Sequence, residues 1–307
     1  MDSVDETTEI INNKSTKVRI LVYLLLIIFT IFFSIYLLFF SAPNGNKPTT
    51  IHISDGQSLN SIVNDLEINK VVKSSFLLKA FVILFKSDRQ ITKGDYLFEK
   101  NLPVFKVAWQ LARGIHNIAP IKITFKEGIT NEEMSTILSD RLPNFNKDLF
   151  LLNNNAKQGY LFPDTYLFFP LTTTDEVIND LSTNFKKRIS MLNSDIISSD
   201  NNLSDIIIMA SILEKEAKGK EDSSIISGIL WNRISKGMFL QVDAEPSTYK
   251  IKGLPEIPID NPGLSTIGAS LKPTNTPYLF YLHDKNGIAH FAKTYQEHKL
   301  NINRYLK

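Results

Sequence analysis

An uncharged apolar run near the start of the chain, residues 20–40, is the feature that most restricts what this protein can fold into. The run consists of Ile, Leu, Val, Phe and Tyr with one Thr and one Ser, and a helix of this length would be about 32 Å long, enough to cross a bilayer. A cleaved signal peptide has a shorter apolar region, and Pro43 directly after Ala42 makes a poor cleavage site. We therefore expect residues 20–41 to form an uncleaved transmembrane anchor.

The charges around this run predict its orientation. The basic residues before it are Lys14, Lys17 and Arg19, and the one that closely follows it is Lys47. Because basic flanks stay in the cytoplasm, we expect residues 1–19 to be a cytoplasmic tail and residues 42–50 to be a linker on the other side. The protein would then be a single-pass protein of the cytoplasmic membrane, with the rest of the chain extracytoplasmic.

The composition excludes several kinds of chemistry. The chain has no cysteine, which rules out thiol catalysis, and its formal net charge of +2 is too small to suggest a nucleic-acid partner. The five histidines are dispersed, and the chain has neither a Gly-x-Ser-x-Gly nor a His-Glu-x-x-His motif. We therefore expect no serine hydrolase, no metal site and no cofactor.

Two segments, residues 51–66 and 123–138, repeat one pattern of strand, acidic-Gly turn and capped helix. Ser58 and Thr130 are the expected N-caps, and Glu133 completes a capping box with Thr130. Between the two segments the sequence predicts a helix over 74–85, a strand over 94–98 and a helix over 103–112, with Pro103 at its first position and Gly114 after its end. Strand, helix, helix, strand is the build of a small sugar-binding module, although many small α+β domains share it.

The segment from Ser204 to Gly219 is an almost wholly apolar helix that ends in two glutamates. Ser204 can act as the N-cap and Gly219 as a left-handed C′ residue, which predicts a helix over Leu203–Lys218. At 100° per residue Glu216 shares a face with bulky apolar side chains, and Glu214 points about 200° away. A carboxyl group held against apolar surface has its charged form disfavoured and can act as a general acid near neutral pH. Helix position alone also fits two ordinary surface residues.

The other expected elements are simpler. The segment 144–157 is a short helix or loop, and Gly159–Tyr166 is an aromatic loop or edge segment that suits either a sugar platform or a core. Further predictions are amphipathic helices over 175–191 and 223–236, an irregular stretch after Met238, strands over 278–282 and 288–292 around a turn at 285–287, and a helix over 294–306.

Several motifs resemble the endolytic murein transglycosylase family, MltG or YceG-like. Two of them are residues 210–217, Ala-Ser-Ile-Leu-Glu-Lys-Glu-Ala, and residues 229–243, Ile-Leu-Trp-Asn-Arg-Ile-Ser-Lys-Gly-Met-Phe-Leu-Gln-Val-Asp. The others are Gly159–Tyr166, Ile251–Pro255, Asn261-Pro-Gly263, Ala269–Pro273, Thr276–Phe280 and the pair His290 and His298. The resemblance covers essentially everything after the linker.

The resemblance implies an α+β protein with one membrane anchor, a LysM-like peptidoglycan-binding module over 51–118 and a lysozyme-like catalytic domain over 119–307. It implies cleavage of MurNAc–GlcNAc β-1,4 bonds in nascent glycan strands to give 1,6-anhydro-MurNAc ends. Peptidoglycan strands, the membrane and peptidoglycan synthases are the implied partners. A non-enzymatic wall-binding scaffold and a hydrolytic muramidase are the alternatives.

The resemblance also implies site residues. Glu216 aligns with the family's acid although Ala217 replaces a hydroxyl residue, and Glu214 is the fallback. The implied substrate-binding residues are Tyr160, Asp164, Asn232, Gln241, Asp243 and Tyr249. The loop after Asp243 is shorter than is usual in the family, so one side of the cleft is expected to be opened or trimmed.

Overall fold

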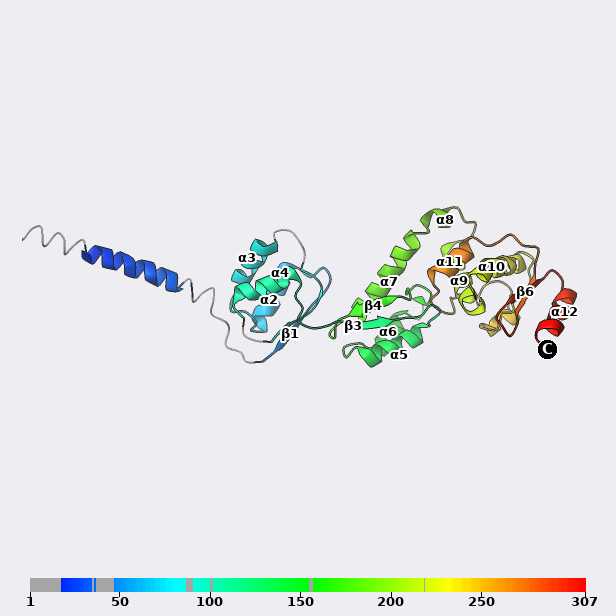
Figure 1. Ribbon diagram of the computed structural model, residues 1–307, viewed down its shortest axis with the longest axis horizontal. Coiled ribbons are helices and arrows are strands. Elements are labelled where there is room, and N and C mark those ends of the chain that lie inside the picture. Colours follow the sequence, from blue (N-terminus) through cyan, green and yellow to red (C-terminus); the bar gives the residue numbers. More distant parts are fainter. Residues whose placement is uncertain are drawn as a thin grey trace, which may run out of the picture. The chain divides into compact units, whose positions relative to one another are not determined.

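The computed structural model describes residues 18–34, 36, 47–86, 91–99, 102–154, 157–217 and 219–307 (Figure 1). The chain divides into two compact units, residues 1–119 and 120–307. Each contains helices and short antiparallel strands, so the expected mixture of α and β structure is confirmed.

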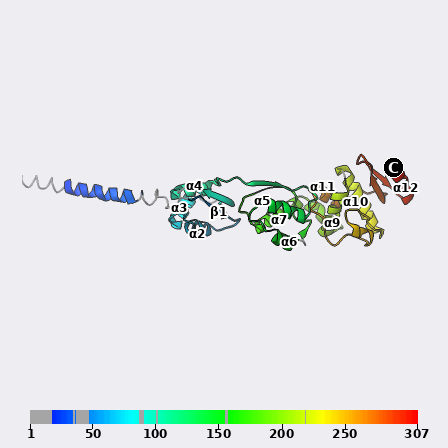
Figure 2. The same ribbon diagram turned by 90° about the horizontal axis from the view of Figure 1, so that it is seen from below.

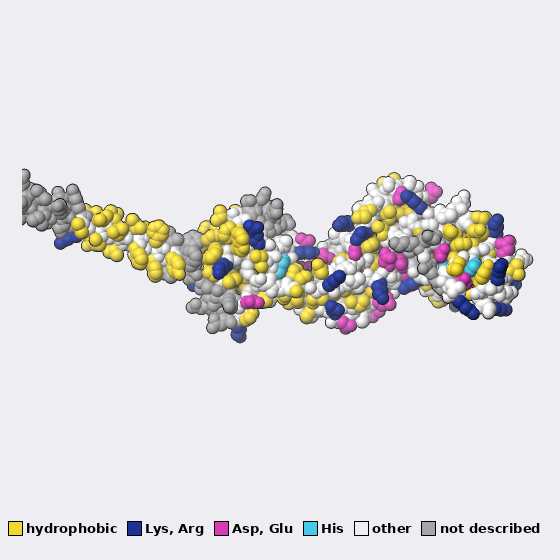
Figure 3. All heavy atoms as spheres, in the orientation of Figure 1, with side chains coloured by type: hydrophobic (Ala, Val, Ile, Leu, Met, Phe, Trp, Pro, Cys, Tyr) yellow, Lys and Arg dark blue, Asp and Glu magenta, His cyan; other side chains and the backbone are white. Residues whose placement is uncertain are grey.

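Residues 18–34 and 36 are helical, and large hydrophobic side chains cover the face of this helix seen in Figure 3. Across the described ranges, we find no helix that is both long enough and apolar enough to cross a membrane. Most of the predicted tail, part of the predicted anchor and part of the linker lie outside those ranges, at residues 1–17, 35 and 37–46. The anchor therefore stays a prediction.

After residue 46, the described part of the first unit contains a two-stranded antiparallel sheet and three helices. Strand β1 (Thr49–Ile53) pairs with β2 (Gly94–Phe98), and the helices are α2 (Leu59–Ile68), α3 (Ser75–Lys86) and α4 (Val104–Arg113). The fully buried side chains at its centre include Leu66, Leu78, Tyr96 and Leu111. This confirms the predicted order of strand, helix, helix and strand.

The predicted helix caps are largely present. Ser58 accepts a hydrogen bond from the Ser61 backbone N–H, and Thr130 and Glu133 form a complete capping box. Gly114 ends α4 in the left-handed conformation (φ 63°) that glycine adopts without strain. Pro103 is the N-cap of α4 rather than its first helical residue, so that prediction was wrong by one position.

The first half of the second unit is built around another two-stranded sheet. Its elements are β3 (Ile121–Thr124), α5 (Asn131–Arg141), α6 (Lys147–Asn154), β4 (Thr165–Phe168) and α7 (Thr174–Ser190). Strands β3 and β4 are antiparallel, with Ile123 opposite Tyr166. Figures 1 and 2 both show the three helices beside this sheet. Phe150, Phe168 and Leu138 are buried in the core they share.

The second half of this unit carries the acidic helix. Its elements are α8 (Asn193–Ile197), α9 (Leu203–Glu216), α10 (Lys220–Ser235), a 3₁₀ helix η2 (Pro246–Tyr249), α11 (Leu264–Leu271), β5 (Phe280–His283), β6 (Ala289–Ala292) and α12 (Tyr295–Tyr305). Helix α9 packs against α10 and α11, and α12 packs against the hairpin of β5 and β6 (Figures 1 and 2).

The predicted start of the acidic helix at Leu203 is confirmed, but both predicted capping residues and the predicted C-terminal end were wrong. Asn202, not Ser204, is the N-cap, because its side chain accepts a hydrogen bond from the Asp205 backbone N–H. The helix stops at Glu216, since Ala217 is already extended (ψ 129°). Gly219 has an extended φ of −155° and precedes α10 as its N-cap, so it is not a left-handed C′ residue of α9.

Asn261 joins the two halves of the second unit. Its Oδ1 accepts hydrogen bonds from the Gly159 (2.9 Å) and Leu161 (3.1 Å) backbone N–H groups, and its Nδ2 donates to the Ile129 carbonyl and to Asn131 Oδ1. The side chain is fully buried, so all these bonds form away from water. The segment that precedes α11 is thereby held against the start of α5.

Candidate active site

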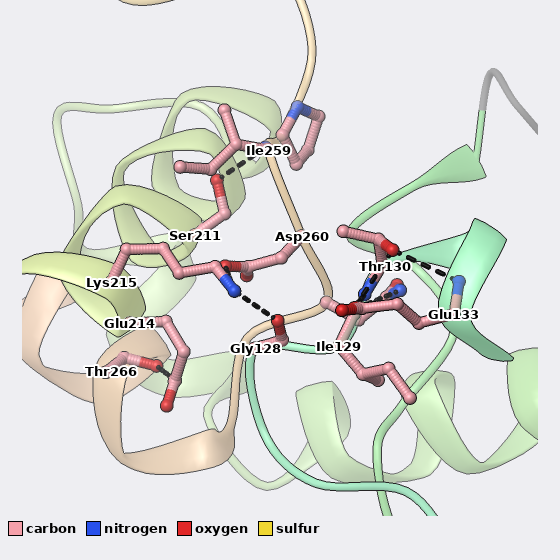
Figure 4. A network of polar contacts seen from close by, with 12 residues as sticks. Gly128, Ile129, Thr130, Glu133, Ser211, Glu214, Lys215, Ile259, Asp260 and Thr266 are labelled. Atoms are coloured by element: carbon pink, nitrogen blue, oxygen red, sulfur yellow. Dashed lines mark hydrogen bonds and ion pairs between the residues drawn. The ribbon is translucent and has the colours of Figure 1, made fainter. Parts of the chain in front are cut away.

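The last turn of α9 carries the candidate acids, and the helix beneath them is rigidly placed. Every residue from Ile206 to Leu213 is buried, which is expected for a central helix covered on all sides. Ser211 accepts a hydrogen bond from the Ile259 backbone N–H (3.0 Å), which joins α9 to the chain before α11 (Figure 4). The position of the final turn is therefore determined by packing along the whole helix.

Glu214 points toward α11. Its Oε2 accepts hydrogen bonds from the Gly263 backbone N–H (2.9 Å) and from the Thr266 hydroxyl (2.6 Å). Gly263 is the N-cap residue of α11 and has no side chain to cap it, so the Glu214 carboxylate supplies the cap and a favourable negative charge. These bonds give Glu214 a complete structural role.

Lys215 lies between the two glutamates in sequence and turns toward the loop before α5. Its Nζ donates to the Gly128 carbonyl (2.7 Å) and lies 3.7 Å from Asp260 Oδ2 (Figure 4). Asp260 is fully buried, and this burial raises its pKa to about 7 although Lys215 opposes the change. This cluster holds the end of α9 against the neighbouring loops.

Glu216 points toward the C-terminal hairpin. Its Oε2 accepts a hydrogen bond from the Tyr281 hydroxyl (2.8 Å), and the side chain is half-buried. Burial is the main cause that raises the pKa of Tyr281 well above its usual value, and the charge and hydrogen bond of Glu216 add to it. Glu216 therefore combines a fixed oxygen with access to solvent, as a proton donor to a large substrate requires.

Arg233 organises the chain around Glu216. The guanidinium is buried and donates from Nε to the Leu279 carbonyl (2.7 Å) and from Nη1 to the Leu240 carbonyl (2.5 Å). Burial lowers its pKa, and the negative charge of Glu216 is among the groups that oppose this change. One side chain of α10 thus fixes both the start of β5 and the segment that leads to Asp243.

Asp243 and Tyr249 lie on the exposed side of this group. The Tyr249 hydroxyl donates to Asp243 Oδ1 (2.5 Å), and this hydrogen bond is the main cause that raises the Tyr249 pKa, with a smaller contribution from the charge of Glu216. Both side chains are exposed. Gln241 is exposed too and has a left-handed backbone (φ 51°), with its N–H donating to the Thr248 carbonyl. Three of the six predicted substrate-binding residues therefore come from one segment.

The other three have structural contacts. Asn232 is half-buried on α10 and donates to the Thr276 carbonyl (2.8 Å). Asp164 accepts hydrogen bonds from Arg188 (2.6 Å) and Asn184 (3.1 Å) of α7, and Tyr160 packs edge-on against Phe185 of the same helix. Burial alone would raise the pKa of Asp164, but its hydrogen bonds with Thr165, Arg188 and Asn184 outweigh burial and lower it. These contacts place Tyr160 and Asp164 against α7, and none of them involves Glu216.

Two cavities border the second unit's loops. One of about 490 Å³ is lined by Gln158, by parts of 244–251 and by 253–259. Another of about 600 Å³ is lined by residues of β3, of α5 and of the loop between them. Neither is lined by Glu216, so the access of substrate to Glu216 is inferred from the exposure of Asp243 and Tyr249 beside it.

Sequence reasoning missed Tyr281 and Arg233. Tyr281 is one aromatic residue among several in a predicted strand, and nothing local distinguishes it. Arg233 gives a clearer signal, because it is an arginine inside a helix whose neighbours Ile229 and Leu230 are buried, and a buried cation must find acceptors.

The comparisons with known proteins agree with these motifs. The model of the YceG-like family matches residues 51–246 and 247–304. A Bacillus subtilis protein named endolytic murein transglycosylase is 26% identical, with 83% of this chain and 84% of that protein covered. A Streptococcus pneumoniae protein of the same name is 23% identical, with 84% of this chain covered and 58% of its own length.

A solved structure shows the same fold. The crystal structure of a YceG-like protein from Listeria monocytogenes aligns with a TM-score of 0.55 at 24% identity, covering 83% of this chain and 99% of that chain. The family resemblance predicted from the sequence is confirmed, and the names of the relatives agree with the predicted class of enzyme. Because the family model matches most of the length of this chain, the chain belongs to the YceG-like family.

Proposed function

We propose that this protein is a lytic transglycosylase that cleaves MurNAc–GlcNAc β-1,4 bonds within peptidoglycan strands and leaves 1,6-anhydro-MurNAc ends. The names of its relatives support the class of reaction. The observation that carries the proposal is the half-buried Glu216 at the end of α9, with one oxygen held by Tyr281 and exposed polar side chains beside it. Glu214 is engaged in capping α11 and is not the proposed acid.

One carboxyl group is enough for this reaction. Neutral Glu216 protonates the glycosidic oxygen as the bond to C1 breaks, and positive charge develops on the MurNAc ring. The resulting carboxylate takes the proton of the MurNAc C6 hydroxyl as that oxygen attacks C1, which closes the anhydro ring and returns Glu216 to its acid form. No water is consumed and no second catalytic carboxylate takes part.

Substrate would approach from the side of Asp243 and Tyr249. Their exposed carboxylate and phenol offer a hydrogen-bond acceptor and an aromatic face to a sugar, and Gln241 adds an amide. We propose these three as substrate-binding residues. Asn232, Tyr160 and Asp164 support the surrounding fold through the contacts described above, and a sugar-binding role for them stays a prediction.

The proposal is tested by digesting uncrosslinked glycan strands and identifying the products by mass spectrometry. Glu216→Gln keeps the size of the side chain but removes the acid, and we expect at least about a hundredfold loss of anhydro ends. Glu214→Gln, two residues away on the same helix, is expected to retain most of its activity at temperatures where it is folded. Normal turnover by Glu216→Gln would overturn the site assignment.

The same digestion separates the two alternatives. A hydrolytic muramidase would incorporate oxygen-18 from labelled water into a reducing end, whereas an anhydro product contains no solvent oxygen. A retaining hydrolase also needs a partner carboxylate about 5 Å from the acid. Of the carboxylates predicted to bind substrate, Asp243 is bound by Tyr249 and Asp164 by Arg188. A wall-binding scaffold would give neither product.

We also propose that the chain is anchored in the cytoplasmic membrane by residues 20–41 and that residues 51–118 bind peptidoglycan as a LysM-like module. The uncharged run supports the first statement, and the order of β1, α2, α3 and β2 supports the second. Membrane fractionation with and without residues 1–46 tests the anchor. Co-sedimentation of residues 47–119 with insoluble peptidoglycan tests the module.

A further inference from the structure

The Tyr281 side chain is built into the hairpin in a way that leaves it little freedom. It is the second residue of β5, and its ring packs, partly buried, against the core formed by α9 and α10. The strand's alternation turns its neighbours away from Glu216: Phe280 stacks with His298, and Leu282 is buried. The hydroxyl is thereby directed at the last turn of α9.

Arg233 fixes the strand from the other side. Its Nε donates to the carbonyl of Leu279, directly before β5, and its guanidinium carbon lies 5.4 Å from the centre of the Phe280 ring and 6.0 Å from that of Tyr281. Because this cation is buried, the backbone that carries Tyr281 cannot move without breaking the bond to the Leu279 carbonyl and leaving the Arg233 Nε–H without that acceptor. The contact with Glu216 is therefore preorganised.

The contact makes the two oxygens of Glu216 different. Burial and the charge of Glu216 raise the pKa of Tyr281, so the phenol keeps its proton and has one hydrogen to donate at any pH at which the protein works. Oε2 can accept that hydrogen both as a carboxylate oxygen and as the carbonyl oxygen of the neutral acid. The acidic proton then belongs on Oε1.

We infer that Tyr281 is a positioning residue that holds Oε2 of Glu216 and so makes Oε1 the oxygen that gives the proton to the leaving sugar and takes it back. The inference rests on the proposed function of Glu216. Other charged or titratable groups that interact with Glu216 or Tyr281 are Arg233 of α10, Tyr249 of η2 and Asp243, which Tyr249 binds.

The test is the pH dependence of kcat/KM for anhydro-end formation by the full-length protein carrying Tyr281→Phe. A hydrogen bond donated to a carboxylate is stronger than one donated to a neutral acid, so the phenol favours the charged form. Its removal should leave Glu216 protonated to higher pH. We expect the alkaline limb of the profile to move up by about 0.5 to 1 pH unit and kcat at the optimum to fall about three- to tenfold.

The matched control is Tyr295→Phe. Tyr295 lies at the start of α12, is 57% exposed and contacts Phe280 of the same hairpin through its ring. Losing its hydroxyl should leave the pH profile in place. A Tyr281→Phe profile that coincides with that of Tyr295→Phe would overturn the inference, because a merely structural tyrosine has no reason to move the limb.

Two further measurements keep the inference testable if Tyr281→Phe folds poorly. Replacing Tyr281 by 3,5-difluorotyrosine keeps its shape but makes the phenol a stronger donor, and the alkaline limb should then move down. Carbon-13 NMR of the Glu216 carboxyl carbon follows its protonation without substrate and should show the same two opposite movements. Unmoved midpoints would refute the inference.

The outcomes for Glu216 and Tyr281 can be told apart. If Glu216→Gln loses activity and the limb fails to move in Tyr281→Phe, only the role of Tyr281 is wrong. If Glu216→Gln remains active, the site assignment fails and the inference fails with it.

Discussion

Two carboxylates two residues apart on α9 have different partners because of helix geometry. Successive residues turn by about 100°, so Glu214 and Glu216 project about 200° apart and meet different elements. Glu214 meets the N-terminus of α11, whereas Glu216 meets Tyr281 on β5. A residue's function here is decided by the element it faces, not by its chemical type.

Glu214→Gln should therefore weaken the fold. The charge that caps α11 is lost, and the short bond from Thr266 becomes an ordinary one, so the free energy of unfolding should fall by about 1 to 2 kcal/mol. Urea denaturation measures this, with Glu216→Gln as the comparison at the same helix end. Equal losses in the two variants would contradict the assignment of the cap to Glu214.

Asp260 should make stability depend on pH. Burial raises its pKa to about 7 in the folded chain, above the value near 4 of an unfolded aspartate. Between these values the folded state binds more protons, so this residue's contribution to stability is fully present below about pH 4 and is lost as the pH rises to about 7.

Asp260→Asn removes this titration. Between pH 5 and pH 8, the free energy of unfolding should change less in this variant than in the unsubstituted protein. The difference between the two changes should be about 1 to 3 kcal/mol. Asp200→Asn, at an exposed position, is the control and should leave the difference as it is. An unchanged pH dependence in Asp260→Asn would show that Asp260 is already ionised in the folded chain.

At the scale of elements, α10 approaches the chain after α11 without room for a side chain. A Cβ at Gly228 would lie 2.1 Å from the carbonyl oxygen of Thr274, and the Thr274 N–H donates to the Ser224 carbonyl. Because the obstacle is backbone rather than a flexible side chain, the two elements can be this close only with glycine at position 228.

Gly228→Ala is therefore expected to cost about 2 to 4 kcal/mol of unfolding free energy, since the helix must move or distort. Gly268→Ala is the matched control: it lies inside α11 with open space where its Cβ would be, so alanine should stabilise the helix by up to about 1 kcal/mol. Thermal unfolding of the two variants decides this, and a neutral Gly228→Ala would contradict the close approach.

How far the sequence predicts these elements depends on how local their signals are. The Thr130 cap is read from Glu133 three residues on, and the hairpin of β5 and β6 from its turn. The sequence predicts an irregular stretch after Met238, but the structure has helix α11 within it. The group that caps this helix, Glu214, lies 49 residues earlier in the chain. The sequence shows no partner for a Gly263 N-cap, so this helix could not be predicted locally.

The candidate site divides in the same way. The motif around Glu216 indicates an acid at a helix end, but its partner Tyr281 is 65 residues away and comes from a strand whose register only the fold determines. The resemblance to the family implies that Asp164 binds substrate. Its bonds to Arg188 and Asn184 depend on how α7 docks, which the loop sequence does not record.

At the scale of the molecule, the two units have separate cores. The buried cluster of the first unit is confined to residues 51–111, and the clusters of the second lie between residues 123 and 271. Among the described residues, no buried cluster contains residues of both units. Each unit therefore has its own hydrophobic core to drive its folding.

The fragment Pro120–Lys307 is therefore expected to fold alone. Its thermal midpoint should lie within a few degrees of the corresponding transition in the full chain, because removing the first unit takes nothing from its core. Calorimetry of the full chain should resolve two transitions, one of which the fragment reproduces. A fragment without a cooperative transition would show that the units depend on each other.

The distance in sequence between Glu216 and Tyr281 has a consequence for synthesis. A ribosome makes α9 well before β5, so a growing chain presents the acid before it has the hydroxyl that orients it. Arg233 likewise waits for the Leu279 carbonyl. The fully oriented acid therefore exists only after the hairpin has been made and has folded back, so a half-made chain would carry a carboxyl group but not yet the oriented proton donor.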